Sequence, residues 1–218
     1  MQIFECDAIP KETDGPDEPL VIARSVSRLT IAVGVWIAAM FWNGISWTIA
    51  YFMYRDGHWF GLVFIGLFLL IGLALFLASI YATLQLFNPE CTLVCSQSRL
   101  YAGSEIEISW THQGNVGRIE ELTITLQGSE EATFVQGTTT RTESSIFYQS
   151  KLVQTKDRSE INEGFRVFSL PNPAMHSFKS KHNTIQWELH THGKIAMWPD
   201  VNENFPLTIY PPSLNAKG

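Results

Sequence analysis

Charged residues are scarce in this sequence, and two long parts of it have none. Of its 218 residues, 17% are Asp, Glu, Lys or Arg, against about 25% in an average soluble domain. No charged residue occurs at 29–54 or at 59–89. A bilayer span needs roughly 20 apolar residues, so these stretches exclude a fully soluble or disordered chain. The net charge of −6 argues against a nucleic-acid partner, because phosphates would be repelled.

Cysteines and catalytic motifs are also few. Cys91 and Cys95 are four residues apart, which places them about 13 Å apart in a strand and excludes a disulfide between them. The sequence contains no nucleophile elbow, phosphate loop, His-Glu-x-x-His motif or dinucleotide fingerprint. We therefore name no catalytic residue and no cofactor, and we expect a protein that is not an enzyme.

The charge-free stretches predict two membrane-spanning helices, at 29–54 and 59–87. The short segment between them forces the helices to lie antiparallel and adjacent. Asn43 is positioned to hydrogen-bond either across this hairpin or to another subunit. Small residues at four-residue spacing fit either a close-packing seam between the helices or the ordinary frequency of alanine and glycine in membrane spans. They are Gly34 and Ala38 in the first helix, and Ala74, Ala78 and Ala82 in the second.

The segments next to the helices predict the orientation in the membrane. Residues 1–28 are acidic and interrupted by Pro and Gly, which predicts a flexible tail. Arg24, Arg28 and Arg99 lie towards the outer ends of the hairpin, whereas its connecting loop contains only Arg55. Because positive residues favour the cytoplasmic side, we expect a multi-pass cell-membrane protein with both termini and the following domain in the cytoplasm.

From residue 90 the hydrophobic pattern changes to a period of two. Ile106, Ile108 and Trp110 alternate with polar residues, and two later segments repeat this alternation. The pattern predicts about eight short antiparallel strands, with turns at Gly103, Gly114 and Gln127-Gly128, and an immunoglobulin-like β-sandwich over 90–212. A short tail follows at 213–218. The polar run 137–145 fits either an edge strand or a long hairpin loop.

Several residues are candidates for binding. His190 and His192 share a strand face with Glu188, which suits either a metal site or a polar face in water. Two further groups are candidate interaction surfaces: one is Trp198, Pro199 and Asp200, and the other is Lys179 and Lys181.

The end of the chain has a distinctive series of motifs. They are a strand ending in Leu170-Pro171, the Pro173 and Ser177 loop, the strand 184–189, Trp198-Pro199-Asp200, and the final strand 205–209. This series resembles the closing part of an arrestin-like domain. The segment 102–108 looks like the opening of such a domain. A two-span hairpin before this module also resembles a group of bacterial membrane proteins. The resemblance covers about 90–212, but the chain has one sandwich where arrestins have two, and no set of residues matches their phosphate sensor.

The resemblance implies an adaptor that binds other proteins. We therefore expect a non-enzymatic, membrane-anchored interaction or scaffold module, whose partners are the lipid bilayer and another protein. The alternative is an extracytoplasmic ligand- or metal-binding accessory subunit of a membrane complex.

Overall fold

The computed structural model describes residues 19–22, 24, 27–136, 139–172 and 174–211. The chain divides into two compact units. The helical unit contains residues 26–88 and the loop 197–200, and the β unit contains the remainder. Residues 1–18 of the predicted N-terminal tail and the whole predicted tail at 213–218 lie outside the described residues.

Two long helices form the helical unit. Helix α1 runs from Arg28 to Arg55 and α2 from Trp59 to Gln85. At 1.5 Å per residue they are about 42 and 40 Å long, and both are long and apolar enough to cross a membrane. The two predicted helices are therefore confirmed, and their ends differ from the prediction by no more than two residues.

Buried residues at seven-residue spacing, most of them small, line the contact between α1 and α2. The buried positions include Ala32, Ala39 and Ser46 in α1 and Ile65, Gly72 and Ser79 in α2. The predicted seam was wrong, because a left-handed helix pair repeats every seven residues rather than every four. Of its five residues only Ala82 is buried, and Gly34, Ala38, Ala74 and Ala78 point outwards.

The polar side-chain groups of Asn43 and Trp42 form hydrogen bonds within the helical hairpin. Asn43 Nδ2 donates to the carbonyl oxygens of Ala39 (2.8 Å) and Gly72 (3.0 Å). A Cβ at position 72 would collide with Asn43 Oδ1, so glycine is what allows this approach. Trp42 Nε1 also donates to the Phe68 carbonyl at 2.9 Å. Asn43 thus hydrogen-bonds across the hairpin, which was one of its two predicted roles.

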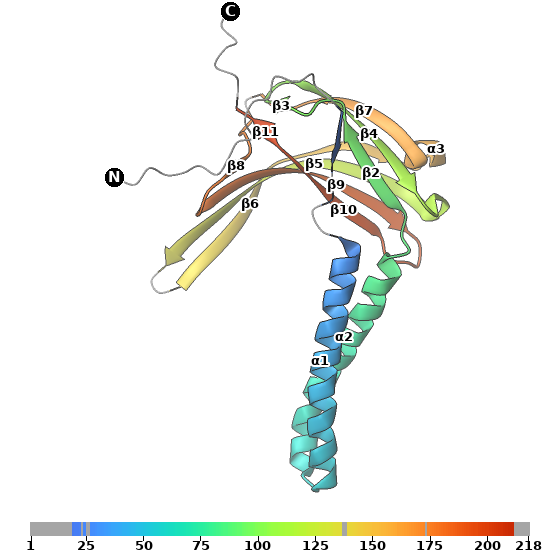
Figure 1. The fold of residues 1–218 in the computed structure, drawn as a ribbon, viewed down its shortest axis with the longest axis vertical. Coiled ribbons are helices and arrows are strands. Elements are labelled where there is room, and N and C mark those ends of the chain that lie inside the picture. Colours follow the sequence, from blue (N-terminus) through green and yellow to red (C-terminus); the bar gives the residue numbers. More distant parts are fainter. Residues whose placement is uncertain (1–18, 23, 25–26, 137–138, 173, 212–218) are drawn as a thin grey trace, which may run out of the picture. The chain divides into compact units, whose positions relative to one another are not determined.

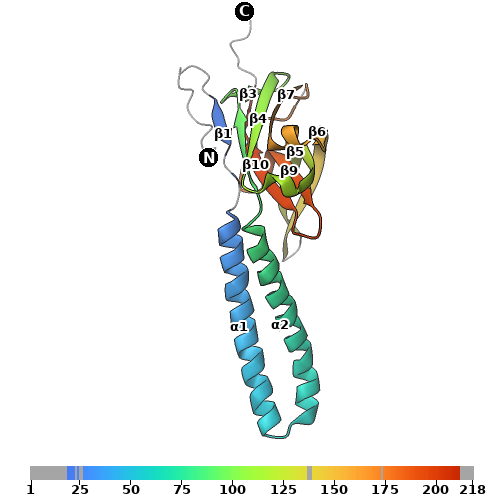
Figure 2. The ribbon, with the colours of Figure 1, turned by 90° about the vertical axis from the view of Figure 1, so that its right-hand side faces the viewer.

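Two antiparallel sheets, which lie one over the other, form the β unit (Figures 1 and 2). The first sheet has the order β1 (Leu20–Ile22), β2 (Glu90–Cys95), β4 (Glu105–Gln113) and β7 (Glu163–Ser169). The second has the order β10 (Val201–Leu207), β9 (Asn183–Ile195), β5 (Ile119–Gln136) and β6 (Thr139–Thr155), and β8 (Phe178–Lys179) also pairs with β9. Strands β3 (Leu100–Tyr101) and β11 (Ile209–Tyr210) form a small parallel pair. A 3₁₀ turn (Val116–Arg118) precedes β5, and the short helix α3 (Arg158–Asn162) joins β6 to β7.

The core follows the predicted alternation of apolar and polar residues. Its fully buried side chains come from both sheets, as expected when each sheet has one face towards the core. They include Leu93, Ile106, Ile108 and Trp110 from the first sheet, and Leu122, Ile124, Leu126, Trp187, Leu189 and Phe205 from the second. The indole N–H of Trp110 donates to the Glu160 carbonyl at 2.8 Å, so this large side chain leaves no unpaired donor in the core.

Two elements differ from the prediction. Residues 20–22 of the predicted tail form β1, which pairs antiparallel with β2. The predicted turn at Gln127-Gly128 is wrong, because β5 continues through it with a register shift between Gly128 and Ser129. The predicted turns at Gly103 and Gly114 are present, and both glycines have a positive φ (78° and 98°) that other residues rarely adopt.

A buried carboxylate joins three segments of the β unit. The side chain of Glu203, on β10, is only 1% exposed, and its Oε1 lies 3.1 Å from Arg24 Nη1. Its Oε2 accepts a hydrogen bond from the Cys91 backbone N–H at 3.1 Å. The other guanidinium nitrogen of Arg24 lies 3.2 Å from Glu90 Oε2, on a side chain that is 61% exposed. Glu203 therefore holds β10, β2 and the segment before α1 together.

Candidate interaction surface

Strand β7 forms an open edge of the first sheet. Among the described strands it pairs only with β4. Phe165 and Val167 lie opposite Ser109 and Glu107 of β4, on the face away from the core, and they are 68% and 49% exposed. Natural edge strands are commonly protected by lysine, proline or a covering segment, so two exposed apolar side chains here suggest a surface for a partner.

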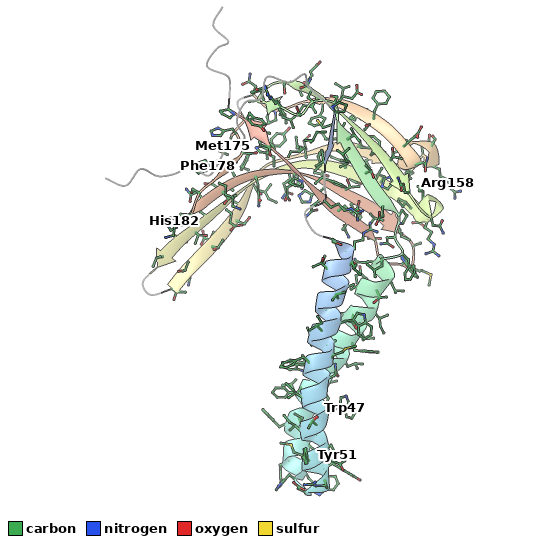
Figure 3. All side chains as sticks on the ribbon, viewed as in Figure 1. Trp47, Tyr51, Arg158, Met175, Phe178 and His182 are labelled. Carbon is green, nitrogen blue, oxygen red and sulfur yellow. The ribbon has the colours of Figure 1, made fainter. Side chains whose placement is uncertain are left out.

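A shallow pocket lies beside this edge. Its volume is about 600 Å³, and it is lined by residues 109–111 of β4, Ser159 and Glu160 of α3, and residues 163–165 of β7. Figure 3 labels Arg158, the first residue of α3. A Cβ at Gly164 would overlap the Trp110 indole ring, so glycine lets β7 lie close to this side chain.

Helix α3 is held by its N-terminal cap. The Asp157 carboxylate accepts hydrogen bonds from the Ser159 hydroxyl (2.8 Å) and from the Ser159 backbone N–H (2.9 Å). These two bonds favour the ionised carboxylate and lower the pKa of Asp157. The cap thereby positions one wall of the pocket.

The predicted histidine face is present on β9. His190 Nδ1 lies 2.8 Å from Asn204 Oδ1, and His190 Nε2 lies 3.5 Å from Glu188 Oε2. His192 is exposed. No group of three His, Cys, Asp or Glu side chains that could hold a metal ion occurs in the described part of the chain. The metal-binding interpretation of His190 and His192 therefore has no ligand cluster to support it.

The other candidate residues lie in two loops. In the helical unit, Trp198 Nε1 donates to Asn88 Oδ1 (2.7 Å), and Asn88 Nδ2 donates to the carbonyls of Pro199 (2.9 Å) and Asp200 (3.2 Å). Pro199 is buried, and Trp198 and Asp200 are half-buried, so internal contacts use part of this predicted surface. Lys179 and Lys181 are exposed, at the end of β8 and just after it. Neither surface is tested by these contacts, and both stay predictions.

Cys91 and Cys95 both lie buried in β2 and are not joined by a disulfide, as their spacing predicted. Burial raises the pKa of the Cys95 thiol, and a hydrogen bond with the Gln97 backbone partly opposes this effect. Cys95 is therefore a protected thiol in the folded protein.

Comparison with known proteins gives little similarity. No protein-family model matches the sequence, and no curated protein matches it. A crystal structure of Spo0M, a sporulation control protein from Bacillus subtilis, is similar over 56% of this chain and 49% of that one. The identity is 14% and the TM-score 0.39. This chain thus matches only about half the length of Spo0M.

The sequence predicts a strand at β7, but the open edge of this strand was not predicted. Phe165 and Val167 lie on one face of that strand and Phe168 on the other, which also carries Arg166. Apolar residues on both faces are typical of a strand that is covered on both sides. Because this chain covers only one face of β7, Phe165 and Val167 were the available signal in the sequence for a surface that a partner covers.

Proposed function

We propose that this protein is a non-enzymatic, membrane-anchored interaction module. In this proposal α1 and α2 cross the cell membrane and the β unit binds another protein. The observation that carries it is the open β7 edge, where exposed Phe165 and Val167 adjoin a pocket of about 600 Å³.

An extended segment of a partner protein is the ligand that suits this edge. Such a segment adds a strand by backbone hydrogen bonds, and alternate side chains then enter pockets beside the edge. At β7, an added strand would place its own side chains beside Phe165 and Val167 on the outer face of the sheet, and the pocket beside α3 would receive one apolar side chain. Strand addition needs no catalytic group, which agrees with the absence of a catalytic motif in the sequence.

The surface of the helical hairpin supports a membrane location. Outward-facing side chains on both helices are large and apolar. Trp47 and Tyr51, labelled in Figure 3, are 64% and 62% exposed in the half of α1 nearer the connecting loop. Aromatic side chains of this kind favour the membrane–water interface. With the arginine distribution given above, we propose a two-span topology with the β unit in the cytoplasm.

The arrestin-like character of the β unit is part of this proposal. It rests on the sequence motifs of the strands and turns at the end of the chain. It implies an adaptor without the receptor-phosphate recognition of true arrestins, because the corresponding residues were not found in this sequence.

Site-specific photocrosslinking in cells tests the edge. A photoreactive phenylalanine analogue at Phe165 should give one discrete adduct with a partner protein, and Val167→Lys in the same chain should abolish it. The matched control is Val21, an exposed valine on β1 at the opposite edge of the same sheet. The analogue at Val21 should give no such adduct, and Val21→Lys should leave the Phe165 adduct intact. No adduct at Phe165, or equal adducts at both edges, would contradict the proposal.

A second experiment tests the topology. A reporter that fluoresces only in the cytoplasm should be active when fused after Gly218, and an export-dependent reporter should be active at Gly57. The opposite pattern would move the β unit outside the cell and would favour the ligand-binding alternative.

A further inference from the structure

The β5–β6 hairpin extends beyond the strand that covers it. Strand β9 pairs with β5 as far as Ala132, opposite Asn183, and the Thr133 N–H donates to the His182 carbonyl. His182 is labelled in Figure 3, and the hairpin arm continues past it (Figures 1 and 3). From residue 134 onwards β5 pairs only with β6 among the described strands. A two-stranded ribbon is marginally stable by itself.

Strand β6 offers a regular open edge along this arm. From Thr139 to Ile146 it pairs with β5 without a register shift, and the first irregularity occurs between Ile146 and Tyr148. Every side chain from 139 to 146 is exposed. The segment contains no proline, lysine or bulge, which commonly prevent a strand from pairing with another chain, and its two charged residues, Arg141 and Glu143, are of opposite sign.

The sequence of this edge is complementary to itself. Arg141 and Glu143 are two residues apart, so they lie on the same face of the strand, opposite Phe134 and Ala132 of β5. Neither charged side chain has an ion-pair partner among the described residues. We infer that the segment 139–145 of β6 pairs antiparallel with the same segment of a second copy of this chain.

Charge selects one register for this pairing. When two copies of a strand pair antiparallel about a two-fold axis, one residue must lie directly opposite the same residue of the other copy, because opposite residues share a face of the sheet. The axis then passes between these two residues. An axis at Arg141 places two arginines opposite each other, and an axis at Glu143 does the same with two glutamates. An axis at Thr142 places Arg141 of each copy opposite Glu143 of the other, which forms two ion pairs. Opposite charges across strands are stabilising and like charges are destabilising.

The other face of the strand fits the same register. Thr140 lies opposite Ser144 of the second copy, and Thr142 lies opposite its own counterpart. Pairs of hydroxyl residues across strands are favourable. Within one chain, Thr142 Oγ1 already lies 3.0 Å from Thr133 Oγ1, so the hydroxyl row would continue across the new pair. The result is one sheet that runs through both copies.

Anchoring both copies in one membrane favours this pairing of two β6 segments. Seven paired residues per copy form a limited interface, and tethering raises the effective concentration of the two strands. This part rests on the proposed membrane anchoring. The crosslinking described below is therefore carried out in membranes and, separately, in dilute detergent. We expect a crosslinked dimer in membranes and much less of it when oxidation follows dilution in detergent.

Disulfide trapping tests the pairing and its register. The full chain with Cys6→Ser and Thr142→Cys is oxidised mildly in native membranes. Residues opposite each other in antiparallel strands have Cα atoms about 4.5–5.5 Å apart, within the range for a disulfide, so we expect a crosslinked dimer. The matched control is Thr140→Cys, whose two copies would be displaced by about 13 Å along the strands and should not crosslink. No dimer at position 142, or equal crosslinking at both positions, would overturn the inference.

Charge reversal separates self-pairing from pairing with a different protein. Arg141→Glu alone, or Glu143→Arg alone, places like charges opposite each other and should reduce the Thr142→Cys dimer about ten-fold. The double variant should restore it. Co-expression of the two single variants with different tags should give mixed dimers, because both ion pairs are then re-formed. Equal dimer yields in all these combinations would overturn the register.

Discussion

Replacing Glu203 by glutamine should destabilise the β unit far more than the same change at Glu90. Both carboxylates contact the Arg24 guanidinium at nearly equal distances, 3.1 and 3.2 Å. They differ in burial, because the Glu203 side chain is 1% exposed and that of Glu90 is 61% exposed. The variants Glu203→Gln and Glu90→Gln therefore remove the same kind of carboxylate from the same arginine, and they differ mainly in the burial of the carboxylate.

The structure sets the size of the difference. Removal of one partner from a buried pair costs about 3–5 kcal/mol, and Arg24, whose side chain is 25% exposed, can regain part of this from water. The glutamine oxygen can also still accept the Cys91 N–H. We therefore expect Glu203→Gln to lower the free energy of unfolding by about 2–3 kcal/mol. Glu90→Gln should lower it by less than about 1 kcal/mol, as for exposed pairs.

Thiol labelling of Cys95 measures the effect in the full chain. Cys95 is 0% exposed in β2 and burial raises its pKa, so a thiol reagent reaches it only when the sheet opens. When opening is rapid and reversible, the labelling rate follows the population of the open state. Glu203→Gln should raise this rate about 30- to 150-fold, and Glu90→Gln less than about five-fold. Fragment masses of the labelled peptide, measured by tandem mass spectrometry, show whether the label is on Cys95 or on another cysteine. Equal rates in the two variants would refute the reasoning, because burial would then have no effect on this ion pair.

Two further predictions concern the wall of the pocket. Gly164→Ala should destabilise the β unit by about 1–3 kcal/mol, because its Cβ would overlap the Trp110 ring. Gly117→Ala, with its nearest atom 3.9 Å away, should leave Cys95 labelling unchanged. Asp157→Asn should flatten the acid dependence of thermal unfolding, followed by circular dichroism between pH about 6 and about 3. Hydrogen bonds from Ser159 lower the folded-state pKa of Asp157, so its stabilising effect is present above the unfolded-state pKa and is lost as pH falls through the folded one. An equally steep acid response in the variant would contradict this role of the cap.

The main elements of the fold are readable in the sequence because periodicity and charge report burial directly. Two charge-free runs predicted α1 and α2, and alternation predicted most strands. Strand β1 has only three residues, too few to show a period, and it exists because β2 offers an edge. Gly128 resembled a turn residue, but it allows the rings of Phe147 and Trp187 to approach the backbone of β5. A local pattern cannot distinguish these two uses of glycine.

The candidate surfaces were less predictable, because an open edge is a property of strand order. Nothing in the residues of β7 states that it is the last strand of its sheet. The run 137–145 was interpreted as an edge strand or a loop, and the structure shows that residues 139–145 belong to β6. The charge complementarity of Arg141 and Glu143 has meaning only once that edge is known to be open.

The two proposed contacts use different sheets, and this allows them to be separated. Strand β6 ends the second sheet and β7 ends the first, so pairing of two copies through β6 leaves both β7 edges open. A dimer would present two partner sites, and a partner with two binding segments would gain affinity from avidity. Arg141→Glu should therefore reduce the Thr142→Cys dimer about ten-fold and leave the Phe165 adduct in place, with a lower adduct yield if the partner is bivalent. Val167→Lys should abolish the Phe165 adduct and leave the Thr142→Cys dimer in place. Loss of both signals in either variant would show that the two edges form one surface, and the assignment of separate partners to them would be wrong.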